Sequence, residues 1–124
     1  MTDPATPTPP PAAAPAPLAS IDDFKRLSFK VGVVVSAEDH PNADRLLVLK
    51  VDIGEGNPRQ LVAGIKGAYQ ASEMVGKRVV VVTNLKPALL RGVESQGMVL
   101  AASDASGLSL ISLERPIQPG SPVK

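Results

Sequence analysis

The sequence contains no cysteine, so it offers neither a disulfide nor a thiolate metal site. It has one histidine, His40, which excludes a histidine-rich metal site and any mechanism that pairs two histidines. Aromatic residues are almost as scarce, because the chain has only Phe24, Phe29 and Tyr69. No run of about 18 apolar residues occurs, and we therefore expect no membrane-spanning segment. The remaining residues favour a binding function over metal or thiol chemistry.

Net charge is also small, at +1 from 13 basic and 12 acidic residues. Such a balance creates no strong field over the whole molecule, so nucleic-acid binding would need a local cluster of cations or two associated chains. The length of 124 residues suits one domain and is too short for two of ordinary size. We therefore expect a single small domain whose useful positive charge lies in one place.

The first 19 residues have a composition of their own. They hold seven of the thirteen prolines, with alanine and threonine making up most of the rest. This mixture predicts an extended, polyproline-like segment, and it lacks the basic start and apolar core of a secretory signal. Proline-rich segments also serve as ligands for aromatic-lined domains, so a partner remains an alternative. We divide the chain into a disordered tail or linker over residues 1–19 and one folded domain over residues 20–124.

The folded part opens with a helix of one or two turns. Ser20 is placed to cap it, and Asp23 lies in its first turn, where the positive helix end favours a carboxylate. Ile21 and Phe24 form the apolar side of this helix, and that side needs something to cover.

Apolar and β-branched residues then predict five or six short strands. A helical turn over residues 72–75, ended by Gly76, separates the third strand from the fourth. Gly32 in the first strand indicates a bulge or sharp bend, and three prolines exclude a central strand over residues 114–124. The expected strands cover residues 30–38, 45–53, 59–64, 78–83 and 98–103, with 108–113 as an optional sixth.

Three strands, a helix and two further strands follow one another in the order of the oligonucleotide/oligosaccharide-binding (OB) fold. We therefore predict an all-β chain that forms a five-stranded Greek-key OB-fold barrel. A short N-terminal helix, a short helix between strands three and four, and extra C-terminal strand would complete it.

The segment from Asn84 to Gly97 is expected to be a long loop between two buried strands. It carries two cations, Lys86 and Arg91, and a glycine, Gly92, where bare backbone lets another molecule approach closely. Loops held by a rigid sheet often carry binding groups, so this loop is the candidate site for a phosphate-bearing ligand. A solvated connection whose cations only keep the protein soluble is the alternative.

The sequence gives little evidence of an enzyme active site. His40 lies in a turn, no serine has a nucleophile elbow around it, and we expect the His40 ring to pack on the barrel rim. The nearby carboxylates lack the spacing of a calcium loop, and no glycine loop leads into a phosphate-binding lysine. We predict no catalysis, no cofactor and no metal.

Nucleic acid is the stronger candidate, although proteins that grip single strands usually stack bases on aromatic rings. Phe24 and Phe29 are expected in the core, which leaves Tyr69 as one possible platform. RNA would then be held mainly through phosphates, 2′-hydroxyls and shape, which favours a structured RNA over a free strand.

The motifs from Lys30 onward resemble the tRNA-binding domain family. This family includes free-standing dimers, the C-terminal extension of many bacterial methionyl-tRNA synthetases, and chaperone-like relatives. The matching pieces are Lys30-Val31-Gly32, His40 to Leu46, Val62 to Ile65, Asn84 to Pro87, Arg91-Gly92 and Glu94 to Met98, after the Ile21-Asp22-Asp23-Phe24 opening.

The resemblance implies a barrel that binds tRNA structurally, without reading an anticodon and without chemistry of its own. It also implies a cytoplasmic homodimer whose partners are tRNA and a methionyl-tRNA synthetase, acting in cis or in trans. The residues expected to contact tRNA are Lys30, Asn84, Lys86, Arg91, Ser95 and Met98. Those expected at the dimer interface are Ile21, Phe24, Leu108, Leu110 and Ile117.

Two positions depart from the family's pattern. Lys30 stands where the family usually has arginine, and Ala88-Leu89 is neutral where it usually has another basic residue. Lysine keeps the charge but not the planar guanidinium fork. Each lost phosphate contact flattens the salt dependence of binding by about one unit of slope, so we expect weaker binding than is typical of the family.

Two of the expected contacts have a structural alternative. Met98 at a strand start is the kind of residue that fills a core, and Ser95 could bond only its own turn. Lys86 and Arg91 are therefore the favoured cations.

A second function, from another class, stays open beside the tRNA-binding module. A CsaA-type export chaperone has the same barrel and would bind unfolded peptides through exposed apolar groups. Leu89 and Leu90 in the candidate loop are the residues that favour it.

Overall fold

The computed structural model describes residues 17–124, so the predicted tail lies almost entirely outside the described part. Within this part no helix is long and apolar enough to cross a membrane. The helices are α1 (Ile21–Lys25) and α2 (Ala71–Met74). The strands are β1 (Phe29–Asp39), β2 (Leu47–Asp52), β3 (Arg59–Ala63), β4 (Arg78–Val82), β5 (Ala88–Leu90), β6 (Val93–Ser95), β7 (Met98–Val99), β8 (Ala101–Asp104), β9 (Gly107–Leu110) and β10 (Pro122–Val123).

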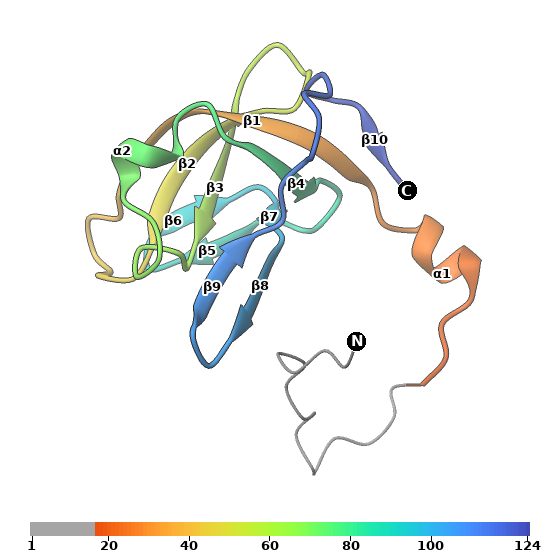
Figure 1. Cartoon of the computed structure of the whole chain (residues 1–124), viewed down its shortest axis with the longest axis horizontal. Helices are drawn as coiled ribbons and strands as arrows, with labels where there is room; N and C mark the ends of the chain where they lie inside the picture. The colour runs from red at the N-terminus through yellow and green to blue at the C-terminus, as the bar shows by residue number, and fades with distance from the viewer. Residues whose placement is uncertain (1–16) are drawn as a thin grey trace, which may run out of the picture.

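The main sheet is built around β1. All of its pairings are antiparallel, and the strand order is β3-β2-β1-β4-β7, with the short β10 added against the start of β1. The first residues of β1 pair with β4 and its later residues pair with β2, so β1 curves over the other strands (Figure 1). The proline-containing β10 pairs only with the end of β1, which agrees with the expectation that residues 114–124 form no central strand.

The bulge in β1 lies three residues beyond the predicted position. The register between β1 and β2 shifts between Val34 and Ser36, which places the irregularity at Val35. Gly32 has a different role, because a Cβ built there would lie 2.5 Å from Cγ1 of Val51. Glycine is therefore needed at position 32 so that β1 can pass close to the side chains of β2 inside the barrel.

The barrel closes between β3 and the segment from β6 to β7, largely through side chains. The hydroxyl of Ser95 accepts from the Val62 backbone N–H at 3.0 Å, and the side-chain oxygen of Gln96 accepts from the Gln60 backbone N–H at 3.1 Å. One backbone bond, from Gln96 N–H to the Gln60 carbonyl oxygen at 2.8 Å, completes the seam. The result is the five-stranded OB-fold barrel that the sequence predicts.

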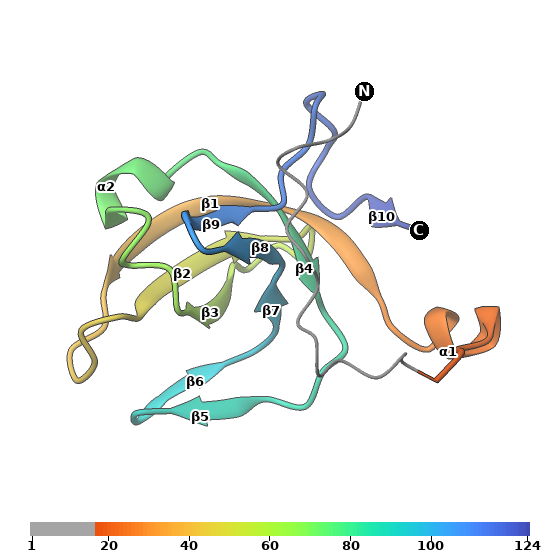
Figure 2. The ribbon, with the colours of Figure 1, turned by 60° about the horizontal axis from the view of Figure 1, so that its bottom comes forward.

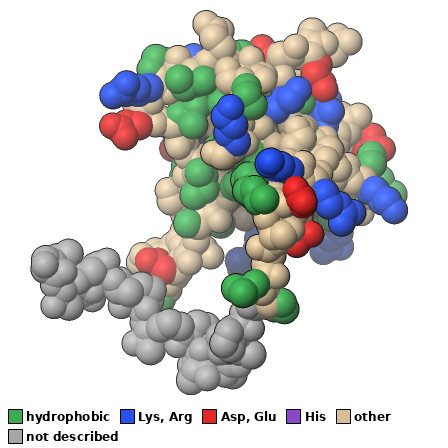
Figure 3. Space-filling model, turned by 90° about the vertical axis from the view of Figure 1, so that its right-hand side faces the viewer, with side chains coloured by type: hydrophobic (Ala, Val, Ile, Leu, Met, Phe, Trp, Pro, Cys, Tyr) green, Lys and Arg blue, Asp and Glu red, His purple; other side chains and the backbone are tan. Residues whose placement is uncertain are grey.

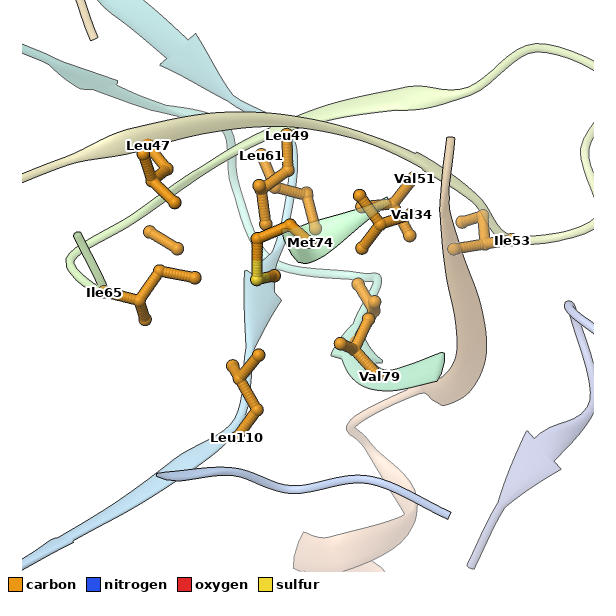
Figure 4. Packing of buried hydrophobic residues seen from close by; sticks show 12 residues of the cluster. Val34, Leu47, Leu49, Val51, Ile53, Leu61, Ile65, Met74, Val79 and Leu110 are labelled. Carbon is orange, nitrogen blue, oxygen red and sulfur yellow. The ribbon is translucent and has the colours of Figure 1, made fainter. Parts of the chain in front are cut away.

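The core fills this barrel from all its walls. The alternation predicted for the second strand is confirmed, because Leu47, Leu49 and Val51 are fully buried on one face. Each such leucine stabilises the fold by about 2 kcal/mol through burial. Met74, from the single turn of α2, is buried among them (Figure 4). The cluster consists of Val34, Leu47, Leu49, Val51, Ile53, Leu61, Ala63, Ile65, Met74, Val79, Val81 and Leu110.

The segment from Asn84 to Gly97 is more ordered than the loop we expected. Its middle forms a two-stranded sheet, β5 paired with β6, which projects away from the main sheet (Figure 2). The predicted fifth strand is also divided: β7 stays beside β4, while β8 leaves the barrel and pairs with β9. The two short strands of this hairpin, joined by a two-residue turn between Leu90 and Val93, contain too few apolar residues to be recognised as strands. A search for apolar runs therefore predicts a loop here.

Helix α1 has the cap that the sequence predicts. The Ser20 hydroxyl accepts from the Asp23 N–H at 3.1 Å, and the Asp23 carboxylate accepts from the Ser20 N–H at 2.9 Å. The expectation that Phe24 and Phe29 belong to the core is wrong, because neither is part of the buried cluster. Helix α1, which carries Phe24, stands away from the barrel (Figure 2). The two phenylalanine rings stack on each other with centroids 5.4 Å apart, and Phe24 remains 42% exposed.

Candidate nucleic-acid interface

The turn after β1 and the β5–β6 hairpin are held together by His40 and Asn42. Nε2 of the buried His40 ring donates to the Leu90 carbonyl oxygen at 2.9 Å, and Nδ1 accepts from the Asn42 N–H at 2.9 Å. These partners require the neutral ring with its proton on Nε2. Nδ2 of Asn42 also donates to the Arg91 carbonyl oxygen at 3.4 Å. The prediction that His40 packs on the rim is confirmed, and its ring positions the hairpin.

Arg91 occupies the tip of that hairpin. With Gly92 it forms a two-residue connection in which φ is +52° at Arg91 and +89° at Gly92, the pattern of a type I′ turn. A left-handed conformation costs a residue with a Cβ roughly 1–2 kcal/mol, and asparagine or glycine usually occupies such a position. The exposed Arg91 guanidinium therefore extends from the most protruding point of the segment, at a cost in backbone energy.

Lys86 lies near the start of the segment from Asn84 to Gly97 (the candidate segment), and Met98, the first residue of β7, follows its end. Both are exposed, and neither Lys86 nor Arg91 forms an ion pair with any residue between 17 and 124. Met98 is 47% exposed, so the alternative that it fills the core is wrong. Two unpaired cations and a soft apolar side chain are thus available to a ligand along one continuous stretch of chain.

The side chains of Asn84, which is exposed, and Ser95, which is buried, both bond to other parts of the protein. The Asn84 amide donates to the Arg26 carbonyl oxygen at 2.7 Å and accepts from the Ser28 N–H at 2.8 Å, which attaches α1 to the loop. Ser95 is 4% exposed, accepts from Val62 and donates to the Gly97 carbonyl oxygen at 2.9 Å. The tRNA contact of Ser95 stays a prediction; its hydroxyl is buried in the seam of the barrel, where it bonds Val62 of β3 as well as its own turn.

Arg59 is the residue that sequence reasoning missed. It grips the Glu55 carboxylate with Nε at 3.0 Å and with Nη2 at 2.9 Å. Its Nη1 donates to the carbonyl oxygens of Thr83 and Gln96, which lie at the two ends of the candidate segment. One guanidinium thus fixes where the segment leaves and rejoins the barrel. One feature of the sequence could have indicated the role of Arg59. It is a cation two residues before the buried Leu61, so it lies on the strand face that points into the core.

Lys30 belongs to the surroundings of this ion pair. The hydrogen bonds from Arg59 hold the pKa of the Glu55 carboxyl below its usual value, and the positive charge of Lys30 adds to that effect. Lys30 itself is half-buried on β1, opposite Val81 of β4. Of the predicted tRNA contacts, Lys86 and Arg91 lie on the candidate segment, Met98 follows its end, and Lys30 lies on β1, where its charge acts on Glu55.

The residues predicted at a dimer interface lie in two different environments. Ile21, Phe24 and Ile117 are exposed, and hydrophobic side chains mix with charged ones on the face that includes α1 (Figure 3). Leu108 is half-buried against the core, and Leu110 is part of the core. The interface role of Leu110 stays a prediction, and its side chain is covered within the single chain.

A five-stranded OB-fold barrel with a cation-bearing hairpin between its fourth and fifth strands defines an oligonucleotide- or oligosaccharide-binding class of domain. In this fold the loops after strands one and four flank the binding face, and here His40 joins those two loops. A family model described as "Putative tRNA binding domain" matches residues 29–122. The chain therefore belongs to the tRNA-binding domain family, as its motifs predict.

Similar proteins of known sequence or known structure agree with this family assignment. The methionine–tRNA ligase of Thermococcus kodakarensis is 47% identical over 105 residues, covering 85% of this chain and 14% of that protein. A MetRS-related protein from Pyrococcus horikoshii has a TM-score of 0.80 at 35% identity, covering 88% of this chain and 100% of that one. The chaperone CsaA of Bacillus anthracis has a TM-score of 0.78 at 27% identity, covering 87% of this chain and 100% of that one. The chain spans 14% of the length of the Thermococcus kodakarensis ligase and 16% of that of the methionine–tRNA ligase of Methanocella arvoryzae.

Proposed function

We propose that the chain is a non-catalytic, structure-specific tRNA-binding module that grips phosphates with Lys86 and Arg91. The observation that carries this proposal is the pair of exposed cations, unpaired among residues 17–124, on a segment anchored at both ends by Arg59 and at its tip by His40. Anchoring supports binding because fewer groups must be ordered when the ligand arrives.

The module would act as a homodimer and assist aminoacylation by a methionyl-tRNA synthetase, in cis or in trans, in the cytoplasm. The low net charge supports the dimer, since two copies would double the cations facing one tRNA. The ligases that contain a similar segment support the synthetase as the partner.

The decisive measurement is a fluorescence-anisotropy titration of bulk tRNA at two salt concentrations. The wild-type chain should bind saturably, and the binding should weaken steeply as salt rises because phosphate contacts release counterions. Lys86→Ala with Arg91→Ala should weaken binding and lower the slope of log affinity against log salt by about two units. Circular dichroism should show the same barrel in both proteins.

Lys77→Ala is the matched control. Lys77 lies over the Tyr69 ring, its nitrogen 5.5 Å from the ring centroid, and is outside the candidate segment. Its loss should leave the salt slope unchanged, whereas Lys86→Ala alone should lower the slope by about one unit. Normal binding by the Lys86/Arg91 double variant would move the tRNA surface elsewhere, and no binding by the wild type at low salt would refute the function itself.

A CsaA-like chaperone activity is the second candidate, favoured by one specific observation. Leu89 is 72% exposed on the hairpin, where a peptide could cover it, and Leu90 beside it is partly exposed. Competition between tRNA and a fluorescent unfolded peptide discriminates the two functions. A peptide that binds the wild type but not Leu89→Ser, and that tRNA does not displace, would favour the chaperone.

A further inference from the structure

A hollow of about 440 Å³ opens between the turn after β2 and the start of the candidate segment. Its volume lies within the roughly 300–1,000 Å³ of small-molecule pockets. The lining of the hollow is chemically mixed and contains an ion pair, two amides and three apolar residues. These are Glu55, Asn57, Pro58, Arg59, Leu85, Pro87 and Gln96.

We propose that this hollow receives one unpaired base of the bound RNA, stacked on the Arg59 guanidinium. The inference rests on the proposed tRNA-binding function and adds a base contact to a surface otherwise described by phosphate contacts. RNA-binding proteins commonly stack splayed-out bases on aromatic rings or on arginine planes. The arginine plane is the option that this chain offers.

The guanidinium of Arg59 is held in a fixed orientation by hydrogen bonds that its N–H groups donate within the guanidinium plane. Four hydrogen bonds, to Glu55, Thr83 and Gln96, use four of the five N–H donors that an arginine has. Little donor capacity is left for a phosphate in the plane. The Arg59 side chain is nevertheless 25% exposed and lines the hollow, so a base in the hollow would contact it, and stacking is the contact that its committed N–H donors leave.

The three aromatic rings of the chain are committed elsewhere. Phe24 and Phe29 stack on each other, and neither lines the hollow. The Tyr69 hydroxyl accepts from the Leu110 N–H at 3.0 Å, and the Lys77 ammonium lies over its ring. Tyr69 is therefore a structural link to β9, and the earlier expectation of a Tyr69 stacking platform is not supported by its surroundings.

Other groups at the hollow suit the edges and flanks of a base. The Gln96 side-chain oxygen accepts from the Gln60 N–H, which fixes the amide orientation and leaves Nε2 without a partner among residues 17–124. That nitrogen can donate to an acceptor on a base edge. Leu85 and Pro87 supply apolar walls, and Lys86 between them supplies a cation for the phosphate of the same nucleotide.

The experiment compares two RNA stems that differ in one group. One carries a single unpaired adenosine, and the other has an abasic sugar at that nucleotide, so the phosphates are identical. Both are titrated into ¹⁵N-labelled full-length chain while the Arg59 Nε and Gln96 Nε2 signals are followed by NMR. The adenosine RNA should bind about ten-fold more tightly and shift both signals, as one stacked base predicts. The abasic RNA should leave both signals in place.

Leu85→Ala and Val75→Ala form a matched pair of variants. Leu85 lines the hollow, whereas Val75 is exposed at the end of α2 and outside it. Leu85→Ala should reduce the ten-fold preference for the adenosine RNA to about two-fold and should leave abasic binding unchanged. Val75→Ala should preserve the preference. Because Arg59 also anchors the segment, its own substitution is not the test.

Three outcomes would overturn the inference, and the first two leave the proposed tRNA-binding function standing. Equal binding of both RNAs with unmoved Arg59 and Gln96 signals would refute the base site while leaving phosphate binding intact. Shifts of both signals by adenosine monophosphate at lower concentrations than by the RNA would assign the hollow to a free nucleotide. Absence of binding by either RNA would refute the proposed function and the base site together.

Discussion

At the scale of single residues, some polar side chains of the candidate segment form hydrogen bonds that hold the protein together, and others have no ion-pair partner in the described part of the chain. Asn84 and Ser95 complete their hydrogen bonds within the protein, whereas Lys86 and Arg91 have no ion-pair partner among residues 17–124. Arg91 is the more informative cation, because its φ of +52° disfavours a residue with a Cβ. Backbone strain of this kind is often found at binding sites.

Arg91→Gly should therefore separate stability from binding. Glycine removes the strain at φ +52° and should raise the free energy of unfolding by about 1 kcal/mol, while loss of the cation weakens tRNA binding. Urea unfolding and the anisotropy titration measure the two effects. Arg91→Ala is the control, since it removes the same charge but keeps a Cβ, so it should bind as weakly without the gain. Equal stability of the two variants would argue against strain at this position.

At the scale of elements, the β5–β6 hairpin depends on a short turn nearly fifty residues earlier in the chain. His40 and Asn42 bond to the backbone of Leu90 and Arg91, so the turn after β1 determines where the hairpin tip lies. The hairpin ladder itself spans three residues on each side, which is marginal for an isolated hairpin. Its position is therefore a property of the contact between the two loops.

His40→Ala should loosen the hairpin without removing a cation. The substitution leaves the Asn42 N–H and the Leu90 carbonyl without their ring partner, at a cost of about 1–3 kcal/mol. Hydrogen exchange followed by NMR should show faster exchange at the β5–β6 amides than at β1 and β2, and tRNA affinity should fall. Asn42→Ala should have a smaller effect, because its 3.4 Å bond is long and exposed. Unchanged hairpin exchange in His40→Ala would contradict this role.

At the scale of the whole molecule, the barrel is complete but α1 is not covered. The core closes within one chain, whereas Ile21 and Phe24 of α1 remain exposed beside the stacked Phe29 ring. The Asn84 side chain links this helix to the candidate segment through Arg26 and Ser28. A second copy that covers α1 would therefore lie next to the helix that Asn84 attaches to the candidate segment. Lys86, one of the cations that we propose for tRNA, is two residues from Asn84 in the chain.

Phe24→Ser should weaken the proposed homodimer. Loss of a large apolar contact should raise the dimer Kd roughly 30-fold, which corresponds to about 2 kcal/mol. Light scattering after size-exclusion chromatography measures the mass across a dilution series. The monomeric variant should also show about half the salt slope for tRNA, because one set of cations is lost. Val75→Ser is the exposed control, and a wild type that stays monomeric at every concentration would contradict the dimer.

Much of the fold could be predicted because its signals are local. The alternation of Leu47, Leu49 and Val51 fixes a strand and its buried face, and Ser20 with Asp23 fixes a helix start. The family motifs then imply a barrel, and the observed antiparallel strand order β3-β2-β1-β4-β7 agrees with that fold. These features depend on neighbours in the chain, so periodicity, capping residues and motif spacing suffice to find them.

The amino-acid sequence by itself determined the barrel, its family and the two cations of the candidate segment, because each follows from residue type and spacing. Only the tertiary structure decided which polar groups remain free for a ligand. Arg59 became the anchor of the segment, Ser95 was buried in the seam and Leu110 was taken into the core through contacts across 37, 33 and 41 residues of chain. Hydrogen-bond partners that distant are set by the packing of the whole barrel, and no local pattern encodes them.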